Sequence, residues 1–324
     1  MRILNTLVAS LALTASWIAV AQAADFPEKP VTIVMPFPAG TGPDTVMRMV
    51  ADKLTTYWKQ PVTIENRPGA NYWTAATAVK KAAPDGYTLL QGDNLMMGLQ
   101  PHVFKKLPFN PVQDFDPVAP MYQTNFFIVV PVDSPWKSIP DLIAAAKTSE
   151  GGLTYGSSGV ASHMHLGGLM LENSEHIKMT HVPVKETPQV FVSVANGELS
   201  FAFGSAPSSG AMLRANKVKY LAFAAPKRNP QFPNVPTVAE AGGPENFELK
   251  SWIALFAPHG TPKEKIEKLN ADITRALNEQ DVSARITEIG FAPWTSTAQE
   301  LGETLAQDTK TLGELAKSQN ISLD

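Results

Sequence analysis

The stretch that decides the fold is Val31–Leu54, with the sequence VTIVMPFPAGTGPDTVMRMVADKL. Its first five residues are β-branched or apolar and predict a buried strand. Pro36–Asp44 follows as a loop rich in proline and glycine. Val46, Val50 and Leu54 then recur at a spacing of four, which indicates one face of a helix. A strand, a glycine turn and a helix in this order are typical of an α/β protein.

The same order recurs later, as a strand at Leu153–Tyr155, a Gly/Ser loop at Gly156–Ser162 and a helix at His163–Glu172. Between and after these units, short strand-like and helix-like runs alternate. The further strands are expected at Val62–Glu65, Tyr87–Leu90, Phe126–Pro131, Leu199–Phe203, Lys219–Ala224 and Leu249–Ala257. The echo predicts two similar α/β lobes. Ligands of open α/β sheets bind outside the carboxyl ends of strands, so two facing turns would form an interlobe cleft.

Capping patterns predict where several helices begin. Ser138-Ile139-Pro140-Asp141 resembles a capping box, and Thr187-Pro188 reads as an N-cap followed by proline at the first helical position. Thr261-Pro262-Lys263-Glu264 reads as a capping box with the same proline position, and Thr297-Ala298-Gln299-Glu300 opens the last helix. Another helix is expected at Thr74–Ala83, which Pro84-Asp85-Gly86 ends.

Composition limits the classes of function. The chain has 324 residues, of which 44% are hydrophobic and 18% charged, which is enough for one substantial core or two modest ones. A net charge of −3 without a basic tract disfavours a nucleic-acid partner. The chain has no cysteine, so disulfides, thiolate metal sites, a thiol nucleophile and a lipid-modified cysteine anchor are excluded.

The N-terminus has the features of a secretory signal peptide. Met1-Arg2 supplies a positive charge, Ile3–Ala24 is uncharged and apolar, and Ala21-Gln22-Ala23 fits the cleavage pattern. We therefore expect residues 1–23 to be removed and the mature chain to act in the periplasm without a lipid anchor. The alternative is an uncleaved membrane anchor, because about 20 apolar residues can span a bilayer.

The two glycine loops are the candidate binding elements. Glycines permit close approach of a ligand to the backbone, and a following helix offers unpaired N–H groups, so each loop could bind an anion without Arg or Lys. The alternative for the first loop is simply a tight strand-to-helix turn. The second loop also supplies hydroxyl groups. An exported hydrolase would need one of Ser157, Ser158 or Ser162 to be activated by His163, but the loop does not match Gly-x-Ser-x-Gly.

Other candidate residues favour structural roles. His163 and His165, with His181 nearby in sequence, are not expected to bind a metal, because a zinc site usually has three or four converging ligands. The acidic residues Asp85, Asp93, Asp114 and Asp116 read as caps and turn formers. Trp58 belongs to a helix core face, whereas Tyr72 and Trp73 follow a turn, where binding and core packing are both open.

An ordered set of short motifs makes the chain resemble the tripartite tricarboxylate transporter receptor family, also called the Bug family of bacterial periplasmic solute receptors. In the first half the motifs are Phe26–Val31, Pro36–Gly40 with Asp44 and Arg48, Glu65–Ala70, Pro84–Leu90 and Asp114-Phe115. In the second half they are Tyr155–Gly159 with His163, His181–Pro183, Val235–Gly242, Ala257-Pro258 and Gly260–Pro262. The resemblance covers essentially the whole mature chain.

The resemblance implies a receptor with a two-lobed periplasmic-binding fold of type II, not an enzyme, with no cofactor and no metal. It implies delivery of a small carboxylate to integral-membrane transporter subunits or to a sensor, and we expect a monomer. Lobe 1 would comprise residues 25–123 and 248–324, and lobe 2 residues 124–247. Ligand contacts carried over from the two loops are Phe37, Ala39, Gly40, Thr41, Asp44, Ser157, Ser158, Ser162 and His163. The remaining predicted contacts are Trp73, Asn94, Met97, Phe203 and Ser205.

Departures from the family pattern add apolar or aromatic area near the expected pocket. Thr41 replaces a second glycine, Asn71-Tyr72-Trp73 replaces Gly-Gly-Asn, Met96-Met97 replaces small polar residues or histidine, and Val184 replaces a frequent tyrosine. We therefore expect an aromatic carboxylate, such as the dicarboxylate terephthalate. The alternatives are an aliphatic di- or tricarboxylate or an acidic amino acid. An anchored structural or sensor-partner module is a further alternative.

Overall fold

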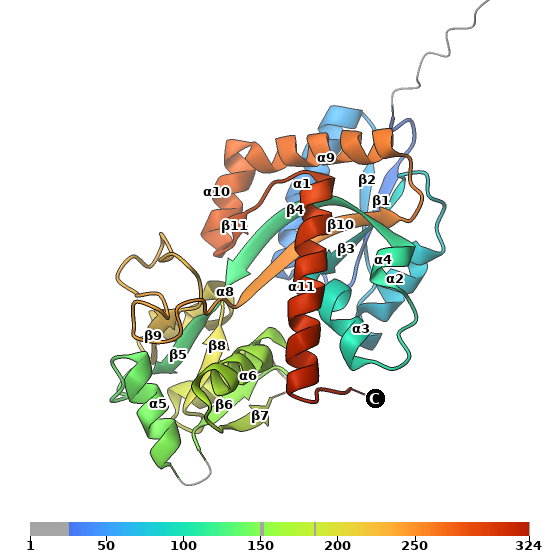
Figure 1. The fold of residues 1–324 in the computed structure, drawn as a ribbon. Coiled ribbons are helices and arrows are strands. Elements are labelled where there is room, and N and C mark those ends of the chain that lie inside the picture. The colour runs from blue at the N-terminus through green and yellow to red at the C-terminus, as the bar shows by residue number, and fades with distance from the viewer. Residues whose placement is uncertain (1–25, 150–151, 185, 324) are drawn as a thin grey trace, which may run out of the picture.

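The computed structural model describes residues 26–149, 152–184 and 186–323, which form two lobes, each built on its own β-sheet (Figure 1). The six-stranded sheet and its helices are called lobe 1, and the five-stranded sheet and its helices lobe 2. The predicted signal peptide lies outside the described residues. Within the described part of the chain, no helix is long and apolar enough to cross a membrane.

Lobe 1 has the strand order β11-β4-β10-β3-β1-β2. Strands β1, β2 and β3 are parallel, and β10 pairs antiparallel with β3 and β4. The strands are β1 (Val31–Met35), β2 (Val62–Asn66), β3 (Thr88–Asp93), β4 (Phe115–Asn125), β10 (Lys250–Pro258) and β11 (Ala292–Pro293). The helical segments are α1 (Gly42–Trp58), η1 (Ala70–Tyr72), α2 (Trp73–Lys80), η2 (Leu95–Leu99), α3 (Gln100–Val103), α4 (Pro111–Asp114), α9 (Lys263–Asn278), α10 (Gln280–Ile289) and α11 (Ala298–Ser318).

Lobe 2 has the strand order β7-β6-β8-β5-β9. Strand β6 is parallel to β7 and β8, whereas β5 is antiparallel to β8 and β9. The strands are β5 (Phe127–Pro131), β6 (Thr154–Ser157), β7 (Thr180–Pro183), β8 (Phe201–Gly204) and β9 (Val218–Phe223). The helices are α5 (Ile139–Thr148), α6 (His163–Glu175), α7 (Thr187–Ala195) and α8 (Ala206–Arg214).

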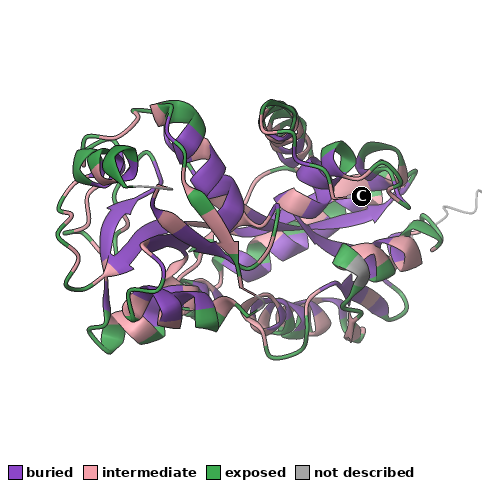
Figure 2. Ribbon diagram, turned by 90° about the horizontal axis from the view of Figure 1, so that it is seen from below, coloured by how far each residue is buried: buried purple, intermediate pink, exposed green. Residues whose placement is uncertain are grey.

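Strand β1 is apolar except for Thr32, because helices cover both faces of its sheet. Val31, Ile33 and Met35 pack with α1, α9 and α10, while Val34 packs on the other face with α2 and α11. Strand β5 behaves in the same way, since Ile128 and Phe127 belong to separate cores. Figure 2 shows buried strands between partly exposed helices in both lobes. The predicted echo is confirmed, because β1–α1 and β6–α6 are both strand–turn–helix units.

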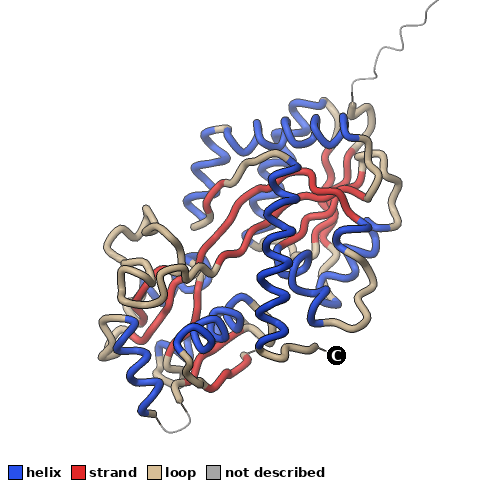
Figure 3. The backbone as a smooth tube through the Cα atoms, viewed as in Figure 1, coloured by secondary structure: helices blue, strands red, loops and turns tan. Residues whose placement is uncertain are grey.

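The chain crosses between the lobes where long strands leave one sheet for the other (Figure 3). Strand β4 ends at Asn125 and β5 begins at Phe127, while Leu249 precedes β10 on the return. The Asn125 amide donates to the Ala224 carbonyl at 3.2 Å and to the Leu249 carbonyl at 3.4 Å, which ties the crossing segments together. The predicted lobe limits, residues 25–123 with 248–324 and 124–247, stay a prediction.

Helix α11 bridges the lobes. It runs from the lobe 1 sheet toward lobe 2 in Figure 1. Its last turns place Leu312, Leu315 and Ala316 against the main lobe 2 core, together with Leu99 and Val103 of lobe 1. The helix begins with a capping box formed by Thr297 and Glu300, and the same device begins α5 at Ser138, as predicted.

Two predicted helix starts are wrong. The Thr261 hydroxyl donates to the Pro258 carbonyl at 2.7 Å instead of capping α9, whose N-cap residue is Pro262. Thr187 is the first residue of α7 rather than its cap, because Glu186 occupies that position without a capping bond. In both cases a proline presets the backbone angle at the start of the helix, so the helix begins without a bond from the threonine hydroxyl.

Candidate ligand-binding site

A cavity of about 410 Å³ lies between the two lobes. Lobe 2 contributes the second glycine loop and lobe 1 contributes the segment after β2 together with η2 and α3. The lining residues are Gly69, Asn71, Tyr72, Leu95, Leu99, Gln100, Val103, Phe104, Ser158, Val160, Ala161, Ser162, His163 and Leu323. Three predicted contacts, Ser158, Ser162 and His163, therefore come together at this cavity.

The conformation of the second loop is fixed by hydrogen bonds within the loop. The Ser162 hydroxyl donates to the Gly159 carbonyl at 2.8 Å and accepts from the His165 amide at 3.4 Å, so Ser162 caps α6. The Ser157 Oγ atom bonds both the amide and the carbonyl of Gly159, at 3.0 and 2.9 Å. Gly159 has φ +134°, and a Cβ atom placed there would meet nothing within 4 Å, so the loop borders open space.

The first loop is closed by the Asp44 carboxylate, which is 2% exposed. It accepts from the Gly40 amide at 2.8 Å, from the Arg48 guanidinium at 2.9 and 3.0 Å, and from the Asn66 amide at 2.9 Å. Burial alone would raise the pKa of Asp44, but the Arg48, Gly40 and Asn66 bonds together hold it below its ordinary value. The turn is therefore organised around a buried carboxylate.

Helix α1 begins without a side-chain cap. Thr41 is its N-cap residue, but the Thr41 hydroxyl donates backwards to the Pro38 carbonyl at 2.7 Å. The first amides of a helix without a cap carry the positive end of its dipole and are available to an anion. Ala39 and Gly40 are exposed, and a Cβ atom on Gly40 would meet nothing within 4 Å.

The first loop does not itself line the interlobe cavity. It adjoins that cavity through Phe37, whose ring lies 5.3 Å from the ring of Tyr72, a lining residue. The Asn66 amide also donates to the Phe37 carbonyl at 2.9 Å. The sequence pattern leaves Tyr72 open between binding and packing, and its departure from the family motif is the signal that indicates a place at the cavity.

His163 connects the two lobes. Its Nε2 atom lies 3.0 Å from Oδ1 of Asn94 in lobe 1, and its ring stacks on Phe126 with centroids 5.4 Å apart. The Asn94 amide nitrogen donates to the Lys250 carbonyl at 3.1 Å. Beyond His163, a groove of about 590 Å³ extends between α6 and α11 and includes Asn94 in its lining. His163 lines both hollows.

The histidines of the site are electrically neutral over the physiological range. Burial lowers the pKa of His163 to about 3. Burial, with a smaller effect of His181, lowers the pKa of His165 to about 4, and burial also lowers the pKa of His181. Asp93, at the end of β3, has a pKa raised by burial to about 6, against the opposing effect of the Met96 and Leu95 amides. The cavity therefore offers no histidine cation to a ligand.

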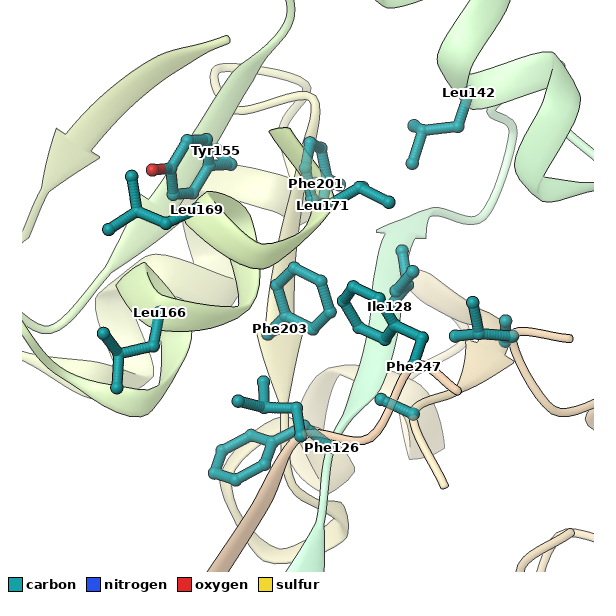
Figure 4. Close-up of a cluster of buried hydrophobic side chains, with 14 of the residues drawn as sticks. Phe126, Ile128, Leu142, Tyr155, Leu166, Leu169, Leu171, Phe201, Phe203 and Phe247 are labelled. Atoms are coloured by element: carbon teal, nitrogen blue, oxygen red, sulfur yellow. The ribbon is translucent and has the colours of Figure 1, made fainter. Parts of the chain in front are cut away.

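The other predicted contacts lie away from the cavity. The Trp73 indole donates to Oε1 of Gln100 at 2.9 Å and packs edge-on against Phe104. Ser205 caps α8. Met97 is 1% exposed and Phe203 is fully buried, and Figure 4 shows Phe203 inside the lobe 2 core near Phe247. As direct ligand contacts these residues stay predictions.

The acidic residues and the histidine group behave structurally. Asp93 accepts from the Met96 amide, and Asp85 from the Tyr87 amide, as expected for caps and turn formers. His165 and His181 stack with centroids 4.0 Å apart instead of converging on an ion. Across the described residues, no group of three or more His, Cys, Asp or Glu could hold a metal ion.

Comparison with known proteins places this geometry in a family. The family model "Tripartite tricarboxylate transporter family receptor" matches residues 46–321. A Pseudomonas sp. (strain P51) protein described as "UPF0065 protein in tcbD-tcbE intergenic region" is 30% identical over 301 residues, which is 93% of this chain and 89% of that protein.

Two solved structures have similar folds. Rpa4515 of R. palustris with adipate has a TM-score of 0.79 and 30% identity, covering 92% of this chain and 99% of that chain. MatC of Rhodopseudomonas palustris with bound malate has a TM-score of 0.75 and 31% identity, covering 90% and 99%. The predicted two-lobed fold of periplasmic solute-binding proteins is confirmed. The chain belongs to the tripartite tricarboxylate transporter receptor family.

Proposed function

We propose that this protein is a periplasmic receptor that captures a small carboxylate between its lobes and delivers it to a tripartite tricarboxylate-type membrane transporter. The observation that carries the proposal is the uncapped start of α1 beside an interlobe cavity bordered by the hydroxyl-rich loop of α6. Backbone amides at helix starts bind anions without a cationic side chain.

The binding step follows from the arrangement of the two loops. A carboxylate would meet the first amides of α1 on one side and the Ser158 hydroxyl of the second loop on the other. Rotation of the lobes about the crossing segments near Asn125 and Leu249 would then bury it, which is a hinge closure. Cleavage after Ala23, action in the periplasm and a monomeric state belong to the same proposal. Delivery to a sensor is the alternative to delivery to a transporter.

For the ligand we favour an aromatic carboxylate. Tyr72 and Phe104 line the cavity with Leu95, Leu99 and Val103, so a flat apolar body would find apolar walls there. The second candidate is an aliphatic dicarboxylate, which the adipate- and malate-bound relatives support. Terephthalate and adipate represent the two possibilities, since each carries two carboxylates on bodies of different shape.

A hydrolase is the rival from another class, and one contact favours considering it. The Ser157 Oγ atom lies 2.6 Å from Nε2 of His181, a distance typical of a nucleophile and its base. Ser157 is fully buried, however, and its hydroxyl already bonds Gly159 on both sides. The ring stacked on His181 is His165 rather than a carboxylate that could orient it. These contacts support a structural role for Ser157, and we infer that the protein is not an enzyme.

Calorimetric titration of the mature protein tests the proposal. Benzoate, terephthalate, adipate, malate, citrate and glutamate are titrated separately, and ester hydrolysis is followed in parallel. We expect saturable binding of at least one carboxylate, no turnover, and tighter binding of aromatic members. Binding of citrate alone would contradict the aromatic assignment. Absence of binding across the panel, or turnover that Ser157→Ala abolishes, would contradict the receptor assignment.

A further inference from the structure

The tautomer of His163 is fixed by a chain of hydrogen bonds that begins at the lobe crossing. The Lys250 carbonyl can only accept, so it orients the Asn94 amide nitrogen toward itself at 3.1 Å. Oδ1 of Asn94 must then face Nε2 of His163, at 3.0 Å, and can only accept from it. The proton of the neutral imidazole therefore resides on Nε2, and Nδ1 carries a lone pair.

The ring cannot easily rearrange to present the other nitrogen. It stacks on Phe126 with an interplanar angle of 19°, and a flip about its axis would break the contact with Asn94. Asn94 is 3% exposed, so water cannot readily replace it as the partner of Nε2. A second proton on the ring is also disfavoured, because burial holds the pKa of His163 near 3.

The Nδ1 atom belongs to a partly exposed ring that lines both hollows. None of the described residues forms a hydrogen bond with it. In the described part of the chain, four buried side-chain atoms have no partner: Gln91 Oε1, Tyr122 Oη, Ser134 Oγ and Thr274 Oγ1. Nδ1 of His163 is not among them, so it lacks a partner without being fully buried. His163 lines the interlobe cavity beside Ser162, so a molecule bound there meets a hydrogen-bond acceptor.

We propose that Nδ1 of His163 selects, among small carboxylates, those that also carry a hydrogen-bond donor such as a hydroxyl or ammonium group. The inference rests on the proposed receptor function and narrows its ligand class. A second carboxylate at this position would bring oxygen lone pairs against the lone pair of Nδ1, whereas a hydroxyl would donate to it. Asn94 acts as a positioning residue, because it acts on the ligand only through the imidazole.

Paired ligands that differ in one donor test the proposal by calorimetry. The pairs are 4-hydroxybenzoate against benzoate and terephthalate, and malate against succinate. We expect the donor-bearing member to bind about tenfold more tightly, which is the effect of one hydrogen bond in a partly buried site. In His163→Leu the preference within each pair should disappear, whatever the change in overall affinity, because the acceptor nitrogen is gone. His259→Leu, which removes an exposed lobe 1 histidine bonded to Asp116, is the matched control and should keep the preference.

Asn94→Asp should reverse the preference within each pair of ligands. A carboxylate at this position favours the imidazolium, so Nδ1 would become a donor and terephthalate and succinate would gain affinity relative to their hydroxyl partners. Nitrogen-15 NMR of the unmodified protein reads the tautomer without any variant, and we expect a neutral ring protonated on Nε2. A ring protonated on Nδ1, equal affinities within each pair, or a preference that survives His163→Leu would overturn the inference while leaving the receptor function intact. Failure of every carboxylate to bind would instead overturn the receptor function, and the inference with it.

Discussion

At the scale of single residues, the part that Gly40 plays in ligand binding can be separated from the conformational cost of replacing it. Gly40 has φ +79° and Gly197, in the turn after α7, has φ +74°, and a Cβ atom on either would meet nothing within 4 Å. Alanine at either position should cost about 1–2 kcal/mol of stability, because both must adopt a left-handed conformation. Only Gly40→Ala should also weaken carboxylate binding by calorimetry. Equal loss of affinity in both variants would show that the first loop has no special part in binding.

Asp44 makes a second test at this scale. Asp44→Asn keeps the shape of the side chain but removes the charge that holds the Gly40 amide, Arg48 and Asn66 together. Since hydrogen bonds to a charged group are stronger than neutral ones, we expect a loss of roughly 1–3 kcal/mol in denaturant unfolding and a parallel loss of affinity. Asp141→Asn is the control, because Asp141 bonds the amides of Lys137 and Ser138 in a similar way at the exposed start of α5. It should leave ligand affinity unchanged.

At the scale of elements, the start of α11 decides how firmly the bridge between the lobes is held. The Thr297 hydroxyl accepts from the Glu300 amide at 3.1 Å, so Thr297→Ala removes a helix cap and should lower the free energy of unfolding by about 1 kcal/mol. Thr311→Ala, in the same helix at an exposed position, should be neutral or slightly stabilising, because alanine favours the helix. Urea unfolding of both variants measures the difference. A Thr297→Ala protein as stable as the parent would contradict the capping argument.

Most elements could be predicted from hydrophobic pattern, and the main omission has a physical cause. Strand β4 contains Pro117 and Pro120, residues that normally interrupt a sheet because they donate no ladder hydrogen bond. The strand tolerates them because its register with β10 shifts between Ile253 and Ala254 and again between Leu255 and Phe256. A sequence pattern reads the proline but not the irregular pairing that accommodates it.

At the scale of the whole molecule, stability should depend on pH through the buried histidines. The pKa values of His163 and His165 are lowered to about 3 and about 4, and that of His181 is lowered as well. The unfolded chain takes up protons near the ordinary pKa of 6.5, so stability is complete above that value and falls between about pH 6.5 and pH 4. Asp93 opposes this trend, because its pKa of about 6 lets the folded state bind a proton first. Three histidines against one carboxyl group give a net loss.

We expect the melting temperature to fall by roughly 5 °C or more between pH 7 and pH 5 in calorimetry. The groups that contact the stacked pair His165 and His181 include the Tyr155 ring, the Ser157 hydroxyl and the Ala161 amide, which donates to Nδ1 of His165 at 3.0 Å. Replacing both histidines with glutamine should flatten the pH dependence even if the variant is less stable at pH 7. A pH dependence as steep as that of the parent would contradict the assignment to these residues.

The binding site was predictable only where local chemistry marks it. The two glycine loops follow from spacing and composition, since a strand, a turn and a helix start are local features. The Asn94–His163 contact joins residues 69 positions apart and depends on how the lobes face each other. The hydrogen bond from the Trp73 indole to the Gln100 amide could not be predicted either. Packing against α3 decides whether that indole faces the ligand or the core.

The position of β10 in the sheet order determines which of the two sheets can be completed first. Every strand of the five-stranded sheet lies between residues 127 and 223, whereas the six-stranded sheet needs β10 from residues 250–258 to join β3 to β4. In the export that we propose, the N-terminus emerges first, so the five-stranded sheet can form while β1, β2 and β3 still lack β10. Such long-range closure is slow. The early strands are exposed during that wait, which makes them the stretch where a periplasmic chaperone would have most to protect.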